Sequence, residues 1–454
     1  MYTFKTTDKE IVNDFNRRNP KGHIFQTSYW ADLKKEWEAK YLAGYKDNGE
    51  IVLTAVILLR KIPYINKYIG YIPRGFTCDY TNRELIEEFT AYLKTYSKEN
   101  RISFITLDPD IHLRENEVEV GEEYRNMFLN LGYISNISKN FENIQPSFVF
   151  RLKFDMTKER EERKKETFNN FTSKTRYNIK VACDRGLSVE VYDKNNITEE
   201  IIDKFYDIMI ITGKRDNFII RPRQYFKDMI CRLGPHCRLY MVRYNYEIDY
   251  KRLQMKLKSQ MENRERLMKK KSDIEETLNR EGEAAENLKL RKKLDDIEKR
   301  LDDAERQIEN FKEKIDSISE YKDKKDMYLS GAIYLNYAGK GWYLYGASHN
   351  ILRDTMPNFL MQWSMIQDSI DLNCYMYDFR GVSGDLSPEN PLYGLYKFKK
   401  GFNGDFVEFI GELDLVSDRL VHKMFRFVLP RFRRIRGKLR NNNRESIRVA
   451  PKFF

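Results

Sequence analysis

The sequence lacks the signatures of the common catalytic and metal-binding classes. It contains no HExxH, GxSxG, Walker A or GxGxxG pattern, and only five histidines are spread along its 454 residues. These absences argue against zinc peptidases, nucleophile-elbow hydrolases, P-loop enzymes and dinucleotide-binding enzymes. The sequence therefore indicates neither nucleophilic nor metal catalysis.

Paired cysteines and long apolar segments are also missing. The five cysteines are an odd number without a CxxC, which predicts free thiols rather than a disulfide framework. Cys231, His236 and Cys237 form one loose cluster with no second ligand pair, so zinc is not favoured. The longest apolar run, 51–59, is too short to cross a bilayer, and the first residues show no secretion signal. We expect a cytoplasmic protein.

The positive charge is concentrated at the C-terminus. The net charge is +12, and from Arg419 onward twelve Lys and Arg residues face Glu445 alone. Between residues 422 and 440 the basic residues alternate with aromatic and aliphatic ones, which favours a basic amphipathic tail (419–454) lying on the anionic inner face of the cell membrane. Binding of tRNA phosphate and a solvated, disordered tail are the alternatives.

The order of predicted elements occurs twice. Each half reads as two helices, an antiparallel hairpin, a long helix and a strand, which predicts a duplicated α/β unit with two mixed sheets. The first copy comprises helices at 8–18 and from Ser28, strands 41–46 and 51–60 around an Asn48-Gly49 turn, helix 82–98 and strand 102–107. Strand 148–154 and a charged helix from about 157 to 185 precede the second copy, which comprises helices 198–212 and 222–233, strands 238–244, 328–337 and 342–346, helix 357–371 and strand 375–379. We expect one domain from 1–152 with 402–418 and another from 153–245 with 327–401.

Residues 246–326 interrupt the hairpin of the second copy. From Leu290 to Ile318 the apolar residues follow a strict heptad spacing, while the first arm carries a weaker seam interrupted by Arg264 and Lys271. This pattern predicts an antiparallel coiled-coil hairpin that turns near Gly282. Periodicity alone favours a solvated spacer or a dimerisation arm.

The segment 343–404 is unusually dense in aromatic, glycine and charged residues. Tyr343 and Tyr345 alternate on a strand expected to break at Gly346, and a later strand runs into a glycine-punctuated loop that starts at Arg380. Loops at strand ends commonly hold ligands. The duplicated α/β unit is similar to the GNAT acyltransferase fold. It lacks the R/Q-x-x-G-x-G/A loop that binds coenzyme A there, so we expect an acyl donor other than acyl-CoA.

Together with TSKTRYNIK at 172–180 and the R-x-x-x-Y pair Arg221/Tyr225, this segment resembles the FemABX family, and the likeness extends over nearly the whole chain. The resemblance implies two GNAT-like domains and an aminoacyltransferase of the peptidoglycan interpeptide bridge. Its donor would be aminoacyl-tRNA, with no further cofactor. Its acceptor would be a side-chain amine on the stem peptide of lipid II or a UDP-linked precursor. An activated ester needs positioning and charge screening rather than a covalent intermediate.

The resemblance also implies roles for individual residues. Four positions match residues that hold the precursor: Lys34, Arg221, Tyr225 and Tyr345. Phe398 and Lys399 match the pair near the tRNA acceptor end, and Lys399 is the expected catalytic residue. Lys174 and Arg176 are expected to face phosphate.

Each of these residues also has a purely structural interpretation. Lys34 suits a solvated helix face, Tyr225 and Tyr345 suit the core, and Lys399 suits a charged helix end. Two other functions stay open: a non-catalytic tRNA- or membrane-tethered coiled-coil scaffold, and an N-acyltransferase with another donor.

Overall fold

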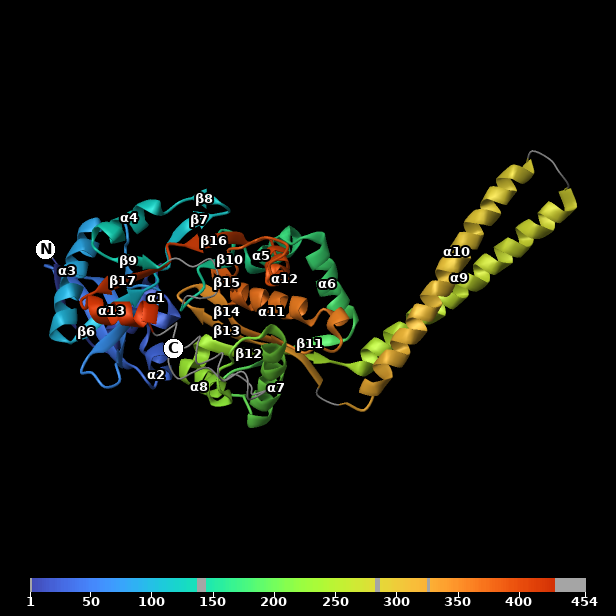
Figure 1. The fold of residues 1–454 in the computed structure, drawn as a ribbon. Coiled ribbons are helices and arrows are strands. Elements are labelled where there is room, and N and C mark those ends of the chain that lie inside the picture. The colour runs from blue at the N-terminus through green and yellow to red at the C-terminus, as the bar shows by residue number, and fades with distance from the viewer. Residues whose placement is uncertain (1, 137–143, 282–285, 325–326, 429–454) are drawn as a thin grey trace.

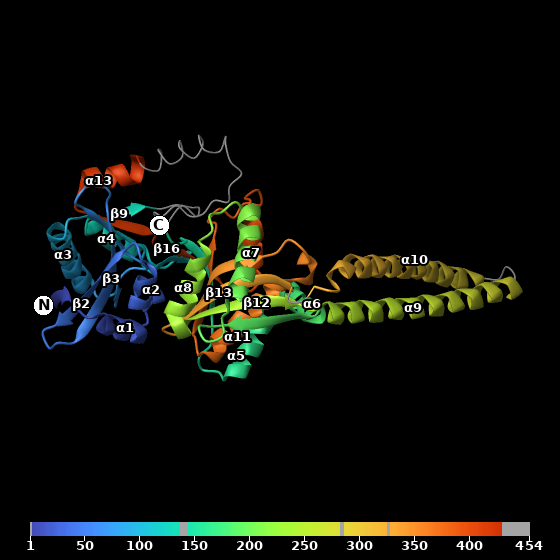
Figure 2. The same cartoon turned by 90° about the horizontal axis from the view of Figure 1, so that it is seen from below.

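The computed structural model describes residues 2–136, 144–281, 286–324 and 327–428. It confirms the α/β fold with two mixed sheets (Figure 1). Figure 2 shows the two sheet-centred bodies side by side and a long helical hairpin that projects from the second. The expected domain limits stay a prediction. Strands from both the N-terminal and the C-terminal parts of the chain contribute to each sheet.

The first sheet is built mainly from the N-terminal part of the chain. In spatial order its strands are β1 (Tyr2–Thr6), β2 (Glu38–Lys46), β3 (Ile51–Lys61), β4 (Tyr68–Ile72), β6 (Ile102–Leu107), β17 (Glu412–Val416) and β9 (Ile134–Asn136), with β5 (Thr77–Cys78) beside β3. Its helices are α1 (Lys9–Arg18), α2 (Ser28–Leu33), α3 (Arg83–Glu99), α4 (Glu122–Asn130) and the C-terminal α13 (Arg419–Lys423). Strand β17 thus returns from the far end of the chain to pair with β6 and β9.

The second sheet takes strands from both parts of the chain. In spatial order they are β11 (Leu187–Tyr192), β12 (Cys237–Tyr244), β13 (Met327–Tyr337), β14 (Lys340–Ser348), β15 (Met376–Val382), β10 (Phe148–Lys153), β16 (Asp405–Phe409), β7 (His112–Glu115) and β8 (Val118–Glu119). The helices around it are α5 (Arg160–Asn170), α6 (Ser173–Asp184), α7 (Glu199–Asp216), α8 (Arg223–Leu233), α11 (Pro357–Asp371) and α12 (Tyr393–Lys400).

The charged helix expected at 157–185 is wrong as a single element. The chain is extended at Phe171, whose side chain is buried in the core that α6 and α11 form with the second sheet, here termed the second core. The Thr172 hydroxyl accepts a hydrogen bond from the Thr175 amide at 3.3 Å. This N-cap starts a new helix, α6. In the sequence, the Thr-Ser pair at 172–173 was the available signal that a new helix starts here.

The two parallel strand pairs at the sheet centres differ. Strands β4 and β6 stay paired along β4 up to Ile72 and Leu107. Strands β14 and β15 pair only up to Trp342 and Asp378 and then separate. The expected break at Gly346 is wrong, because β14 continues to Ser348. Instead, a bulge against β13 lies between Tyr343 and Tyr345.

The helical hairpin of α9 (Tyr246–Glu281) and α10 (Glu286–Ile318) connects β12 to β13, as the interrupted-hairpin prediction requires (Figure 1). Two polar seam residues of α9 form ion pairs with α10: Arg264 with Glu305 at 3.0 Å and Lys271 with Glu298 at 2.7 Å. These pairs set an antiparallel register, although exposed ion pairs of this kind contribute little stability.

The base of the hairpin belongs to the second core. Asp249 is buried, with its carboxylate 2.7 Å from Arg185 Nε and 3.0 Å from the Tyr244 hydroxyl. Leu253 and Ile318 are also buried there. The hairpin is therefore anchored at its base, and in the described distal part α9 and α10 pack against each other.

We predict that the two parts of the hairpin differ in their effect on stability. Replacing residues 259–308 by a short glycine-rich loop should preserve the cooperative unfolding transition, because it removes only the distal part. Removing 250–321 should lower the free energy of unfolding by at least about 3 kcal/mol, because Leu253 and Ile318 leave the core. Thermal and denaturant unfolding of both variants tests this, and equal stability losses would contradict it.

Candidate functional site

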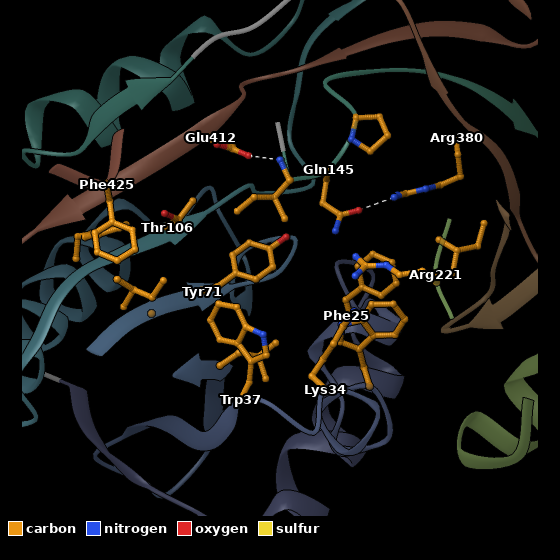
Figure 3. A pocket seen from close by; sticks show the side chains of 18 of the residues that line it. Phe25, Lys34, Trp37, Tyr71, Thr106, Gln145, Arg221, Arg380, Glu412 and Phe425 are labelled. Atoms are coloured by element: carbon orange, nitrogen blue, oxygen red, sulfur yellow. Dashed lines mark hydrogen bonds between the residues drawn. The ribbon is translucent and has the colours of Figure 1, made fainter. Parts of the chain in front are cut away.

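A cavity of about 580 Å³ lies where the two bodies meet (Figure 3). Its walls come from α2, β3, β4, β6 and β17 on one side and from β14, β15 and the residues before α8 on the other. A volume of this size is typical of small-molecule sites. Lys34, Arg221 and Arg380 define what we term its cationic end.

Lys34 is placed at this end by the early termination of α2. The helix ends at Leu33, and Lys34 adopts a non-helical C-cap conformation. Its Nζ lies 4.4 Å from the centroid of the Trp30 ring and donates a hydrogen bond to the Tyr225 hydroxyl at 3.0 Å. Desolvation lowers the pKa of Lys34 to about 8, and the nearby charge of Arg221 also lowers it. Lys34 is therefore not the solvated helix lysine of the structural interpretation.

Arg221 and Tyr345 converge on the same place from distant segments. Arg221 precedes the first turn of α8, and its guanidinium carbon lies 5.5 Å from the centroid of the Tyr225 ring. The Tyr345 ring packs edge-on against the Tyr225 ring at 6.4 Å between centroids. Three of the four residues predicted to bind precursor thus line one cavity, and Tyr225 contacts all three from behind.

The bulge in β14 separates two tyrosines that simple alternation would place together. Tyr345 lines the cavity and packs with the core cluster that contains Phe226 of α8. Tyr343 packs with the second core on the other side of the sheet. The Tyr343 ring centroid lies 5.8 Å from Lys399 Nζ. The bulge therefore directs one tyrosine to each of the two groups of predicted residues.

Phe398 and Lys399 lie away from the cavity, on α12. Lys399 is buried, and its Nζ donates hydrogen bonds to the carbonyl oxygens of Arg380 at 3.2 Å and Gly381 at 2.7 Å. Burial lowers the pKa of Lys399 to about 7. The Phe398 ring is half-buried and packs edge-on against Phe359, with 4.9 Å between ring centroids.

Arg380 joins the two groups of residues, and the sequence reasoning did not assign it a role. Its backbone carbonyl accepts from Lys399 while its guanidinium points into the cavity, contacting Gln145 (Figure 3) and lying 5.6 Å from the Phe25 ring centroid. Its φ is +60°, and its amide donates to Asp378 Oδ1 at 2.6 Å. Burial lowers the pKa of Arg380 to about 10. Its place at the start of the glycine-punctuated loop was the only sequence signal.

The opposite side of the cavity carries an acidic group that the sequence also did not reveal. Glu412 is buried at the start of β17, accepts a hydrogen bond from the Ile144 amide and lies 3.3 Å from Arg426 (Figure 3). Desolvation raises the pKa of Glu412 to about 7. Burial also raises the pKa of Asp108, whose charge interacts with that of Glu412, to about 6.

The residues of the TSKTRYNIK segment lie outside this cavity. Arg176 donates hydrogen bonds to the carbonyl oxygens of Asn169, at 2.6 Å, and of Phe171. These bonds engage its guanidinium at the α5–α6 junction. Lys174 is exposed. Their expected contact with phosphate stays a prediction. Within the residues that the structure describes, no cluster of His, Cys, Asp or Glu suited to a metal ion occurs.

We predict that Lys399 destabilises the folded protein at neutral pH. The pKa of Lys399 is about 7 in the folded protein against an ordinary value of 10.5, so the unfolded chain binds more protons between these values. The penalty is full below pH 7 and fades as pH rises toward 10.5. Lys399→Met should therefore raise the free energy of unfolding by about 1–3 kcal/mol at pH 7, with an advantage that shrinks at higher pH.

Denaturant unfolding of the wild type and Lys399→Met from pH 6 to 10 measures this effect. A variant less stable than the wild type at pH 7 would show that the two carbonyl hydrogen bonds outweigh the cost of burial. A difference independent of pH would show that the pKa of Lys399 is not lowered in the folded protein.

The chain is similar to known proteins over nearly its whole length. The chain is 29% identical over 434 residues to a lipid II:glycine glycyltransferase of Staphylococcus epidermidis, covering 94% of this chain and 95% of that protein. It is 28% identical over 444 residues to the enzyme of the same name from Staphylococcus aureus, covering 94% and 95%. The crystal structure of FemX superposes with a TM-score of 0.67 and 25% identity over 93% of this chain and 99% of that one. A profile of the FemAB family matches residues 7–429, and the chain belongs to this family.

Proposed function

We propose that the protein transfers a small amino acid from aminoacyl-tRNA to the side-chain amine of the lipid II stem peptide and so builds the interpeptide bridge. The observation that carries this proposal is the convergence of Lys34, Arg221 and Tyr345 on one cavity between the two bodies. The lipid II:glycine glycyltransferase relatives support the reaction class and the acceptor.

The cationic end suits the diphosphate of the precursor. Lys34, Arg221 and Arg380 present three positive side chains to one side of the cavity, where little water competes for a bound anion. The phenol of Tyr225 accepts the hydrogen bond from Lys34 and fixes that ammonium in place. These residues would position the precursor.

The aminoacyl-tRNA end would approach on the side of the sheet that carries α12. Beyond Trp342 and Asp378 the parallel strands separate, and just past this point the Lys399 side chain donates to the carbonyls of Arg380 and Gly381 in β15. In its charged form Lys399 would meet the acceptor-end phosphate or the developing ester oxyanion. Phe398 would stack on a base.

The chemistry is an aminolysis. The acceptor amine attacks the ester carbonyl and the bond to the terminal ribose oxygen breaks. The proton lost by the amine is taken up by the departing ribose oxygen, which leaves as a hydroxyl. Positioning of the two reactants and stabilisation of the oxyanion supply the rate enhancement, so we propose no cofactor beyond the aminoacyl-tRNA.

We predict a mass gain of one or a few small amino acids when a lipid II analogue is incubated with the protein and a mixture of charged tRNAs. Mass spectrometry of the lipid product measures the gain and identifies the amino acid. Treating the charged tRNA with RNase beforehand should abolish the gain. Transfer that survives RNase and requires acetyl-CoA would contradict the proposal.

We further propose that the basic tail holds the protein at the membrane that carries its acceptor. No described helix meets the length and apolarity needed to span a bilayer. The structure describes the predicted tail (419–454) only up to residue 428, so most of its amphipathic stretch at 422–440 lies outside the described residues. Of the described part, His422 and Arg426 do not face solvent freely: His422 Nε2 lies 2.8 Å from Asp414, and Arg426 Nε donates to the same carboxylate at 2.7 Å.

We predict that a version ending at Val428 will bind phosphatidylglycerol vesicles more weakly than the full chain. This truncation keeps the His422 and Arg426 contacts and removes most basic residues of the tail, each contributing about 1 kcal/mol near an anionic surface. Co-sedimentation at low and high salt measures the difference. Equal binding of both versions, or binding insensitive to salt, would contradict the proposal.

A further inference from the structure

The side of the cavity opposite Arg221 and Arg380 has an apolar wall. Trp37, Ile69, Phe104 and Phe425 all line it, and we term these four residues the apolar arm. Figure 3 shows Phe425 across the cavity from Arg221 and Arg380, with Tyr71 between them. The cavity is thus cationic at one end, while the other end combines this apolar wall with the paired side chains of Glu412 and Arg426.

The apolar arm belongs mostly to a small satellite cluster. Its residues pack there with Ile62, Val416 and Val421, and Trp37 also packs against a main core. Phe425 is the outermost member, and its ring packs edge-on against Phe104 with 5.9 Å between centroids. A satellite cluster that lines a cavity leaves apolar surface available to a ligand.

The chain after β17 is held in place so that Phe425 reaches this wall. The Asp418 side chain caps α13 by accepting hydrogen bonds from the amides of Leu420, at 3.0 Å, and Val421, at 3.1 Å. Asp414 binds both His422 and Arg426, on either side of Phe425. These contacts fix the position of the ring.

The polar groups that border the apolar arm are engaged with one another. The Thr106 hydroxyl donates to Asp414 at 2.6 Å, and the Glu412 carboxylate accepts from the Ile144 amide and from Arg426. A nucleobase would need such groups for its own hydrogen bonds, whereas a hydrocarbon needs none. The composition of the arm therefore favours an apolar ligand.

We propose that the apolar arm binds the first units of the isoprenoid chain of a lipid-linked precursor whose diphosphate occupies the cationic end. This inference rests on the proposed function, because it is that acceptor which joins an anionic diphosphate to a long hydrocarbon.

The surface beside the arm fits a ligand whose remaining chain lies in a bilayer. The β3–β4 loop follows Ile62 of the same cluster and exposes Tyr64 completely and Ile65 in part. Lys67 of this loop pairs with Asp418 at the start of α13, which brings the loop and the helix together. Exposed aromatic and aliphatic side chains next to basic ones are typical of a membrane-interface surface.

The test compares the binding of farnesyl diphosphate with that of isopentenyl diphosphate, which has the same head group and a shorter chain. Calorimetric titration of the full-length protein should show that the farnesyl compound binds at least about tenfold more tightly, because its additional carbons enter the arm. Phe425→Asp should abolish this preference, because it weakens binding of the farnesyl compound more than binding of isopentenyl diphosphate. Phe425→Leu should retain it.

Val118→Asp is the matched control, because Val118 is an exposed apolar residue on β8, away from the cavity. Equal affinity of the wild type for the two diphosphates would overturn the inference, and so would a preference that survives Phe425→Asp. If Phe425→Asp does not fold, Phe425→Ala replaces it, with the same expected loss of preference. Absence of aminoacyl transfer in the mass-spectrometric assay would instead remove the proposed function, and the two failures are therefore distinguishable.

Discussion

The buried carboxylate of Asp378 is the constraint on which the site depends. It accepts a hydrogen bond from Arg151 Nε at 3.0 Å, and Arg151 in turn binds Asp110 at 2.8 Å. Its other oxygen accepts from the Arg380 amide. Buried charges of this kind are costly unless fully paired, so removing one partner would leave an uncompensated charge. The network ties β15 to β10 and to the chain that follows β6.

The same network fixes the backbone at the point where β14 leaves β15. With its amide held by Asp378, Arg380 adopts a positive φ, directs its side chain into the cavity and presents its carbonyl to Lys399. The two groups of predicted residues therefore meet at one residue, Arg380, whose side chain belongs to the cavity and whose carbonyl binds Lys399. In the proposed reaction, this residue is where the precursor and the aminoacyl ester approach each other.

Much of this architecture could be predicted from local sequence patterns. The heptad spacing identified the hairpin, and the repeated order of elements identified the two sheets, because both signals are carried by neighbouring residues. The break at Phe171 was missed because charge continues across it, and only the cap at Thr172 marks it. The separate directions of Tyr343 and Tyr345 were missed because a bulge depends on the partner strand.

Site residues were predictable only where they carried a recognisable motif. Lys34, Arg221 and Tyr345 did, and the structure brings them together. Arg380 and Glu412 did not, since their positions depend on contacts between segments far apart in the chain, such as Arg380 with Gln145 and Glu412 with Ile144. The roles assigned to the motif residues stay predictions.

The central claim is that Arg221 serves the precursor and Lys399 serves the transfer step, from opposite sides of β15. The measurement that tests it most directly is precursor affinity together with the single-turnover transfer rate at saturating precursor. We expect Arg221→Ala to weaken lipid II binding by roughly one to two orders of magnitude and to preserve the saturated rate. Lys399→Met should preserve affinity and slow transfer. If both substitutions alter the same step, the account of two separate approaches is wrong.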